Sequence, residues 1–203
     1  MTASNKERSK SEAKTEAVLQ GAIKEFLANG YAATSMDKVA KTAGVSKATV
    51  YSHFGDKESL FNAVIQDLVK DKFQMIISLD SPQSLEQDPK LFLSQIANRV
   101  LTNAKSDRNF QNLIRIIIGE SGRFPELAKA YVNYIVKPAI ETLTKYFKSH
   151  PKLQPEDPEA TVRVMMGTLI YFVMLQEMMF GKDIVPLEDE RLIKTLTDLI
   201  VDC

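Results

Sequence analysis

The sequence is poor in the side chains that form covalent or metal-mediated cross-links. It contains one cysteine, Cys203, and two histidines, His53 and His150. A single cysteine excludes an internal disulfide. Two histidines far apart in the chain, with no paired-histidine motif and no Cys-x-x-Cys, argue against a zinc site. No glycine-rich phosphate loop is present in the sequence either, so we expect neither a metal nor a cofactor.

Long apolar runs are also scarce. No apolar run follows the charged start of the chain as a signal peptide would require, so we expect a protein that stays in the reducing cytoplasm. The one long apolar stretch, 165–180, is interrupted by Gln176 and Glu177 and falls short of the ~20 residues that a bilayer crossing needs. We expect a buried helix there and no membrane partner.

The chain has no excess of charge of one sign, since 26 Lys and Arg residues balance 26 Asp and Glu residues. Residues 1–60 carry 9 basic and 7 acidic side chains, which is only a small positive excess. Net charge therefore does not identify a nucleic-acid binder, and only local patterns can. With 203 residues, 44% of them hydrophobic, the chain can form one large domain or two small ones with real cores.

Polar and apolar residues nowhere alternate for long enough to predict a sheet, so we expect an all-α fold. The division that we expect is a disordered arm at 1–14, a three-helix domain at 15–60 with a connecting helix to about 77, and a second helical body at 78–203 that begins with a linker. Helices of the second body are predicted at about 89–105, 108–120, 124–149, 157–181 and 188–202. Pro138 should kink or split the third of them.

The stretch 34–54 carries the clearest functional pattern, two short helices joined by a tight turn. Ser35 and Ser46 fit the N-caps of the two helices, and Gly44 fits the left-handed position where the first must stop. Apolar residues share one face of the first helix: Met36, Val39, Ala40 and Ala43. The pattern predicts a helix-turn-helix whose second helix can enter a major groove. An ordinary helical hairpin with a solvated polar face shares this pattern.

The flanking residues favour the DNA-binding interpretation. Residues 15–74 resemble the amino-terminal domain of the TetR family of one-component transcriptional regulators. The matching segments are 26–31 (FLANGY), 34–36 (TSM), 39–40 (VA), 43–51 (AGVSKATVY), 53–54 (HF) and 57–60 (KESL). Ser52 departs from the family, many members of which carry a second aromatic residue there. The resemblance implies a three-helix DNA-binding domain in a dimeric regulator of transcription.

We expect the DNA interface to use eight residues. Phosphates would be contacted by Thr34, Ser35, Tyr51, His53 and Lys57, and base edges by Lys47, Ala48 and Thr49. Lys47 suits a guanine, and the methyl groups of Ala48 and Thr49 suit a thymine. Lys57 lies in the first turn of a helix, where a cation is unfavourable unless an anion is near; it either meets a phosphate, as the resemblance implies, or points to water.

A second resemblance covers most of the remaining chain. The segment 115–127 (RIIIGESGRFPEL) is similar to the carboxyl-terminal domain of the AefR-like branch of the family. The helix around 162–180 is apolar on every side, and the last helix carries a matching stripe, so two such pairs would bury both as a four-helix bundle. TetR-like proteins dimerise in the same way. We therefore expect a homodimer through roughly 157–202, and an ion pair of Glu120 with Arg115 or Arg123.

The same body is expected to bind a small-molecule effector. Its methionines can form an adaptable lining for an apolar ligand, although core and dimer packing is the commoner role of any single methionine. The candidates for the pocket are Ile117, Tyr134, Met166, Ile170, Val173 and Glu177. In so apolar a helix, the Glu177 carboxylate needs either an arginine partner or a pocket where it selects a cationic or hydroxylated ligand.

Together these patterns predict a sequence-specific DNA-binding regulator, a repressor released by an effector, rather than an enzyme. The segment 119–122 (GESG) resembles a nucleophile elbow, but its second glycine comes one place early and no strand precedes it. Two alternatives stay open: an all-helical ligand-binding protein or enzyme with an incidental helix-turn-helix, and an architectural DNA binder. The sequence does not identify the effector, the operator or the regulated genes. It also leaves open whether the protein represses or activates transcription, and which face of 157–181 meets the pocket and which the partner.

Overall fold

The computed structural model describes the backbone of residues 3–76, 87–153 and 155–201, and the side chains of 11–68, 87–153 and 155–201. These ranges are helical and contain no strand, which confirms the all-α prediction. The chain forms two compact units. One joins the residues up to 70 with 112–134, and the other joins 71–111 with 135–203. We call them the reading unit and the body unit.

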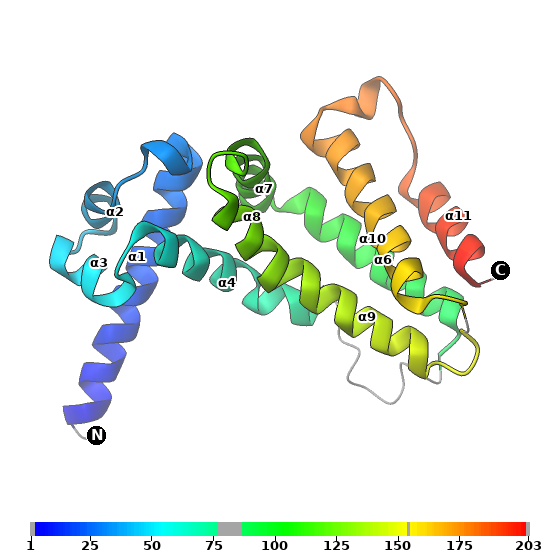
Figure 1. Cartoon of the computed structure of the whole chain (residues 1–203), viewed down its shortest axis with the longest axis horizontal. Helices are drawn as coiled ribbons and strands as arrows, with labels where there is room; N and C mark the ends of the chain where they lie inside the picture. The colour runs from blue at the N-terminus through cyan, green and yellow to red at the C-terminus, as the bar shows by residue number, and fades with distance from the viewer. Residues whose placement is uncertain (1–2, 77–86, 154, 202–203) are drawn as a thin grey trace. The chain divides into compact units, whose positions relative to one another are not determined.

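The reading unit begins with four helices, α1 (Ala3–Ala33), α2 (Met36–Ala43), α3 (Lys47–Phe54) and the start of α4 (Lys57–Ile76). In Figure 1, α2 and α3 lie beside α1. Fully buried side chains from all four helices form the core: Val18, Ala22, Phe26, Val39, Val50, Leu60, Phe61, Val64 and Ile65. The rings of Phe26 and Phe61 meet edge to face, with centroids 5.2 Å apart.

Residues 3–14 differ from the expected disordered arm, because they are the first turns of α1. The segment is rich in Ala, Lys and Glu, which have high helix propensity. Its continuation 15–33 is anchored in the core, and extending an existing helix is far easier than nucleating one. A polar stretch without apolar periodicity therefore still becomes helical when it precedes an anchored helix.

The reading unit also contains a later segment that we had assigned to the second body. It consists of most of α7 (Arg108–Glu120), α8 (Pro125–Tyr131) and the start of a π-helical turn, η1 (Val132–Val136). Leu127 and Ala130 are buried in α8. The expected boundary near 78 therefore does not describe the packing, because 112–134 fold against the amino-terminal helices. The predicted linker falls mostly on residues 77–86, outside the described ranges.

The body unit is a bundle of α6 (Pro89–Ser106), α9 (Lys137–Ser149), α10 (Pro158–Val173) and α11 (Asp189–Val201). Its core includes Leu93, Leu101, Phe147, Val162 and Met165, each at most 1% exposed. Two ion pairs tie α6 to α11, Lys105 with Asp189 and Lys90 with Asp198. The bounds of α6 and α11 lie within one residue of the predicted positions, whereas α10 ends at Val173, before the predicted end at 181.

Pro138 splits the predicted helix 124–149 as expected. The segment forms α8, then the π-helical turn η1, then α9 with Pro138 in its first turn. Proline lacks an N–H, and its ring presses on the carbonyl four residues earlier. A wider π-helical turn directly before Pro138 accommodates that ring while the chain stays helical.

The helix α10 is buried on one side only. By length and composition alone, Pro158–Met178 could cross a membrane. However, Val162, Met165 and Leu169 pack in the core of the body unit, as in a core helix of a globular bundle. On the other side Val164 and Tyr171 are 62% and 65% exposed, so an apolar surface remains for a partner.

Candidate nucleic-acid interface

The helix-turn-helix has the local geometry that its sequence predicts. The Ser35 Oγ accepts the Lys38 amide at 3.3 Å, and the Ser46 Oγ accepts the Thr49 amide at 3.1 Å, so both helices have their N-caps. Gly44 takes the left-handed conformation, with φ 67° and ψ 28°. These caps fix where α2 ends and where α3 begins, which sets the angle of the reading helix.

A close contact between α1 and α2 supports this arrangement. A Cβ added to Gly21 would lie 2.9 Å from the Cβ of Ala43 and 3.0 Å from its backbone N. Ala40, on the same helix, is 4% exposed. Gly21 was not among the residues predicted to matter for the helix-turn-helix. A glycine inside an otherwise helical stretch was the available signal.

The helix α3 carries the three residues predicted to read bases, Lys47, Ala48 and Thr49, and the predicted phosphate contact Tyr51. Lys47 and Ala48 are exposed, as is Tyr51, whereas Thr49 is half-buried. The hydroxyl groups of Thr49 and Ser46 are 2.8 Å apart and form a hydrogen bond. Three of the four side chains can therefore be reached from solvent on one side of the helix.

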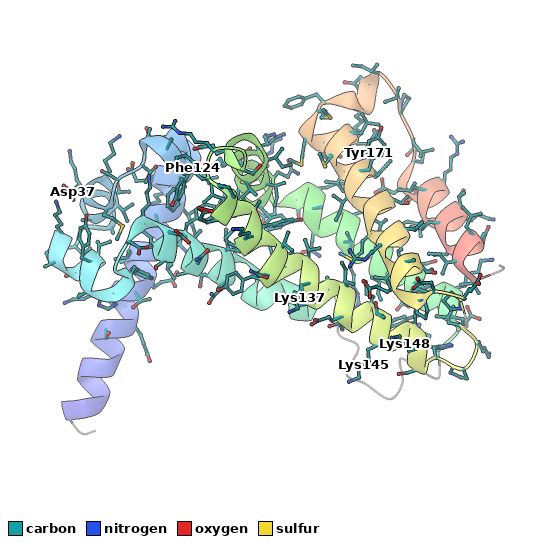
Figure 2. The ribbon with its side chains drawn as sticks, viewed as in Figure 1. Asp37, Phe124, Lys137, Lys145, Lys148 and Tyr171 are labelled. Carbon is teal, nitrogen blue, oxygen red and sulfur yellow. The ribbon has the colours of Figure 1, made fainter. Side chains whose placement is uncertain are left out.

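Lys47 is paired with an acidic residue of α2. Its Nζ lies 2.7 Å from Oδ1 and 2.8 Å from Oδ2 of Asp37, and 5.8 Å from the centre of the Tyr51 ring. The hydrogen bond to Asp37 raises the pKa of Lys47. Asp37 is labelled on α2 in Figure 2. The ammonium of the reading helix is thus held in place by a carboxylate of the neighbouring helix.

Two predicted phosphate contacts, Thr34 and His53, have internal partners. Thr34 is only 2% exposed and its hydroxyl donates to the Gly30 carbonyl at 2.7 Å. It cannot reach a phosphate without leaving this position, so we omit Thr34 from the interface. His53 is half-buried, with Nδ1 3.0 Å from the Thr15 hydroxyl, which links the end of α3 to α1. Ser35, by contrast, is exposed.

The Lys57 ammonium binds backbone carbonyls at the end of α1. Nζ donates to the carbonyls of Tyr31 at 2.9 Å and Thr34 at 3.0 Å, and it lies 4.4 Å from the centre of the Tyr31 ring. Burial lowers the pKa of Lys57. The Lys57 cation at the start of α4 is therefore compensated within the protein. The sequence had suggested a phosphate or water as its partner, not backbone carbonyls.

Asp56 caps the same end of α4. Its Oδ1 accepts the Ser59 amide at 2.7 Å. That backbone hydrogen bond lowers the pKa of Asp56, because it stabilises the ionised carboxylate. Hence α4 begins with a carboxylate cap and a lysine that reaches back to α1.

Glu120, at the end of α7, also binds the end of α1. Its Oε1 accepts the Tyr31 amide at 2.7 Å and its Oε2 accepts the Ala32 amide at 2.9 Å. The sequence had suggested arginine partners. In the structure the Arg115 guanidinium donates to Asn112, and that of Arg123 lies over the Phe124 ring. The role of Glu120 could not be read from its neighbours in sequence.

The six pocket candidates fall in both units. Ile117 and Tyr134 belong to the reading unit, and Met166, Ile170, Val173 and Glu177 belong to the body unit. Ile117 and Val173 are buried, and Met166 packs against the core of the body unit. The effector pocket stays a prediction. Separately, among the described residues no group of three His, Cys, Asp or Glu side chains could hold a metal ion.

Comparisons with known proteins agree with this geometry. Residues 18–64 match the family model for bacterial regulatory proteins of the tetR family, and residues 92–202 match that for the C-terminal domain of AefR-like transcriptional repressors. The HTH-type transcriptional regulator YhgD of Bacillus subtilis (strain 168) is 29% identical over 163 residues, which cover 77% of this chain and 80% of that protein.

Solved structures are similar over nearly the whole chain. The flavonoid-responsive regulator FrrA is 27% identical, with a TM-score of 0.78 over 93% of this chain and 95% of its own. A TetR-family regulator from Mesorhizobium loti MAFF303099 is 28% identical, with a TM-score of 0.75 over 95% of both chains. The chain therefore belongs to the TetR family of DNA-binding transcriptional regulators, with an AefR-like C-terminal domain.

Proposed function

We propose that the protein is a homodimeric repressor that leaves its operator when a small molecule binds to the helices that follow α4. The observation that carries this proposal is the capped α3, with Lys47, Ala48 and Tyr51 exposed on one side. The similarity of residues 92–202 to AefR-like repressors supports repression rather than activation.

In this proposal α3 lies in the major groove. Lys47, Ala48 and Thr49 meet base edges, with Lys47 reading guanine O6 and N7. Phosphates are bound by Ser35, Tyr51, His53 and Lys57, which set the register of the helix. Lys57 would then serve both a phosphate and the carbonyls at the end of α1.

The second copy of the chain would cover the exposed apolar sides of α10 and α11. Val164, Tyr171 and Leu199 are each more than 60% exposed, and they lie on the two helices predicted to form a four-helix bundle. Two copies related by a two-fold axis would place their reading helices in successive major grooves, about 34–36 Å apart. This arrangement requires a near-palindromic operator.

The effector would be an apolar small molecule. FrrA is described as flavonoid-responsive, and SmeT, which shares the fold at 17% identity, is described in complex with triclosan. In this chain the predicted lining consists mainly of methionine, isoleucine and valine, which suit an apolar ring system. Glu177, in the π-helical turn η2 (Met174–Met178), would select a hydroxylated or cationic group on it. We place the protein in the cytoplasm, where its operator is.

Selection of bound sequences from a random duplex pool, with purified protein at a stated salt concentration, tests the proposal. We expect enrichment of a palindrome whose half-sites lie about one helical turn apart. If no sequence is enriched while the protein stays folded and dimeric, the operator-binding function is wrong. Compounds can then be screened for release of the enriched duplex, and the effector role fails if none changes the affinity at saturation.

A further inference from the structure

The end of α1 has a backbone conformation that leaves peptide groups open to distant partners. Gly30 has φ 74° and ψ 175°, a region that residues with a side chain rarely adopt. The helical hydrogen-bond pattern is broken at this point. As a result, the amides of Tyr31 and Ala32 are available to a group outside α1, and that group is the Glu120 carboxylate.

Glu120 and Lys57 hold opposite sides of this turn. The carboxylate accepts the amides of Tyr31 and Ala32, while the ammonium donates to the carbonyls of Tyr31 and Thr34. All of these hydrogen bonds involve a charged group, and such bonds are about twice as strong as neutral ones. Glu120 of α7 therefore binds the amides of the turn 30–34, and Lys57 of α4 binds carbonyls of the same turn.

The fit between Glu120 and the turn is close. A Cβ added to Gly30 would lie 2.7 Å from Oε1 of Glu120, so Gly30 provides room as well as the backbone angle. The Phe124 ring, labelled in Figure 2 at the start of α8, meets the Tyr31 ring with centroids 5.0 Å apart. Tyr31 is itself packed edge to face on Phe61 of α4, at 5.3 Å, and is 6% exposed.

The turn leads directly into the reading helices. Thr34 is followed by Ser35, the N-cap of α2, and α2 packs on α3. On the other side, Glu120 is the last residue of α7, a helix that begins with residues of the body unit and ends in the reading unit. A shift of α7 along its axis would therefore move the Glu120 carboxylate relative to the turn.

We propose that Glu120 is the positioning residue through which α7 controls the DNA-reading helices. With its carboxylate on Tyr31 and Ala32, the turn holds α2 and α3 in the arrangement that binds DNA. When α7 shifts, both amides lose their partner and the turn is free to move. This inference rests on the proposed function and adds to it the contact by which the effector-binding helices act on the reading unit.

Glu120→Gln tests the role of the carboxylate. A glutamine can accept one amide, but its own NH₂ group opposes the second, so one hydrogen bond is lost and the charge is removed. We expect the affinity for the selected duplex to fall by about tenfold, within the usual range of coupling between sites. The salt dependence should not change, because Glu120 contacts no phosphate. Glu126→Gln, an exposed glutamate of α8, removes the same charge and should bind like the natural protein.

Hydrogen exchange measures the contact directly, and its response to DNA is the readout that a purely structural role would not move. In the free protein, the amides of Tyr31 and Ala32 should exchange faster in Glu120→Gln than in Glu126→Gln. Since coupling is reciprocal, the operator duplex should slow exchange of these two amides in the natural protein. This second measurement decides the question even if Glu120→Gln does not fold.

The outcomes separate this inference from the proposed function. If the natural protein selects a palindrome but Glu120→Gln binds it with unchanged affinity, the positioning role is wrong and the operator-binding function stands. Unchanged exchange of the Tyr31 and Ala32 amides on adding the duplex would also overturn it. If the natural protein selects no sequence, the operator-binding function itself fails.

Discussion

Asp37 and Lys47 form an ion pair across the helix-turn-helix, with both carboxylate oxygens within 2.8 Å of the ammonium. Both side chains are more than half exposed, so the pair contributes little to stability. The pair instead sets the position of Lys47, because it keeps the ammonium of this α3 residue beside α2.

Replacing Asp37 by Asn should therefore loosen DNA recognition. A released Lys47 can reach phosphates of any sequence, so we expect tighter binding to a scrambled duplex, a smaller preference for the operator, and a salt slope steeper by about 1. Fluorescence anisotropy over a range of salt concentrations measures all three. Glu16→Gln, which removes an exposed charge on α1, is the control. A preference equal to that of the natural protein would show that Asp37 does not position Lys47.

Gly21→Ala should destabilise the reading unit, because the new Cβ would lie 2.9 Å from the Cβ of Ala43. Overpacking of this kind costs roughly 1–3 kcal/mol, against about 1 kcal/mol gained in helix propensity. We expect a net loss of up to about 2 kcal/mol in the free energy of unfolding, measured by denaturant titration. Gly119→Ala is the matched control, since its Cβ meets nothing within 4 Å. Equal stability of the two variants would contradict the close contact.

Lys57→Ala should weaken binding to all duplexes alike and reduce the salt slope by about 1, if the lysine binds a phosphate. It should also lower the melting temperature, since the carbonyls of Tyr31 and Thr34 lose their donor. Anisotropy and calorimetry separate the two effects. A lower melting temperature with an unchanged salt slope would limit Lys57 to its structural role, and an altered base preference would rule out the phosphate contact.

Tyr171→Asp should break the dimer. Tyr171, labelled on α10 in Figure 2, is 65% exposed within one chain, and the proposed bundle would bury it. A buried unpaired carboxylate should weaken association by about 2 kcal/mol or more, which sedimentation velocity at micromolar concentration would detect. Lys145→Glu, on α9, changes an exposed charge of the body unit and should leave the dimer intact. A dimeric Tyr171→Asp protein would place the interface elsewhere.

The helices of this protein and its family could be predicted from local patterns in the sequence. Helix ends could be predicted from Ser35, Gly44, Ser46 and Pro138, because capping and proline effects act within one turn of the residue that causes them. The exposed side of α3 followed from helical periodicity. Residues 3–14 were misjudged because their helical state depends on the anchored helix that follows them, not on their own pattern.

The contacts that hold the reading unit together depend on packing between residues far apart in the sequence. Glu120 lies 89 and 88 positions from the two amides that it binds, and Lys57 lies 26 from the Tyr31 carbonyl. Gly21 has its close neighbour in another helix, at Ala43. Spacing along the chain reveals which residues share a helix face, but not which backbone groups a distant turn leaves unpaired. Those groups take as partners whatever charged side chains the packing brings to them.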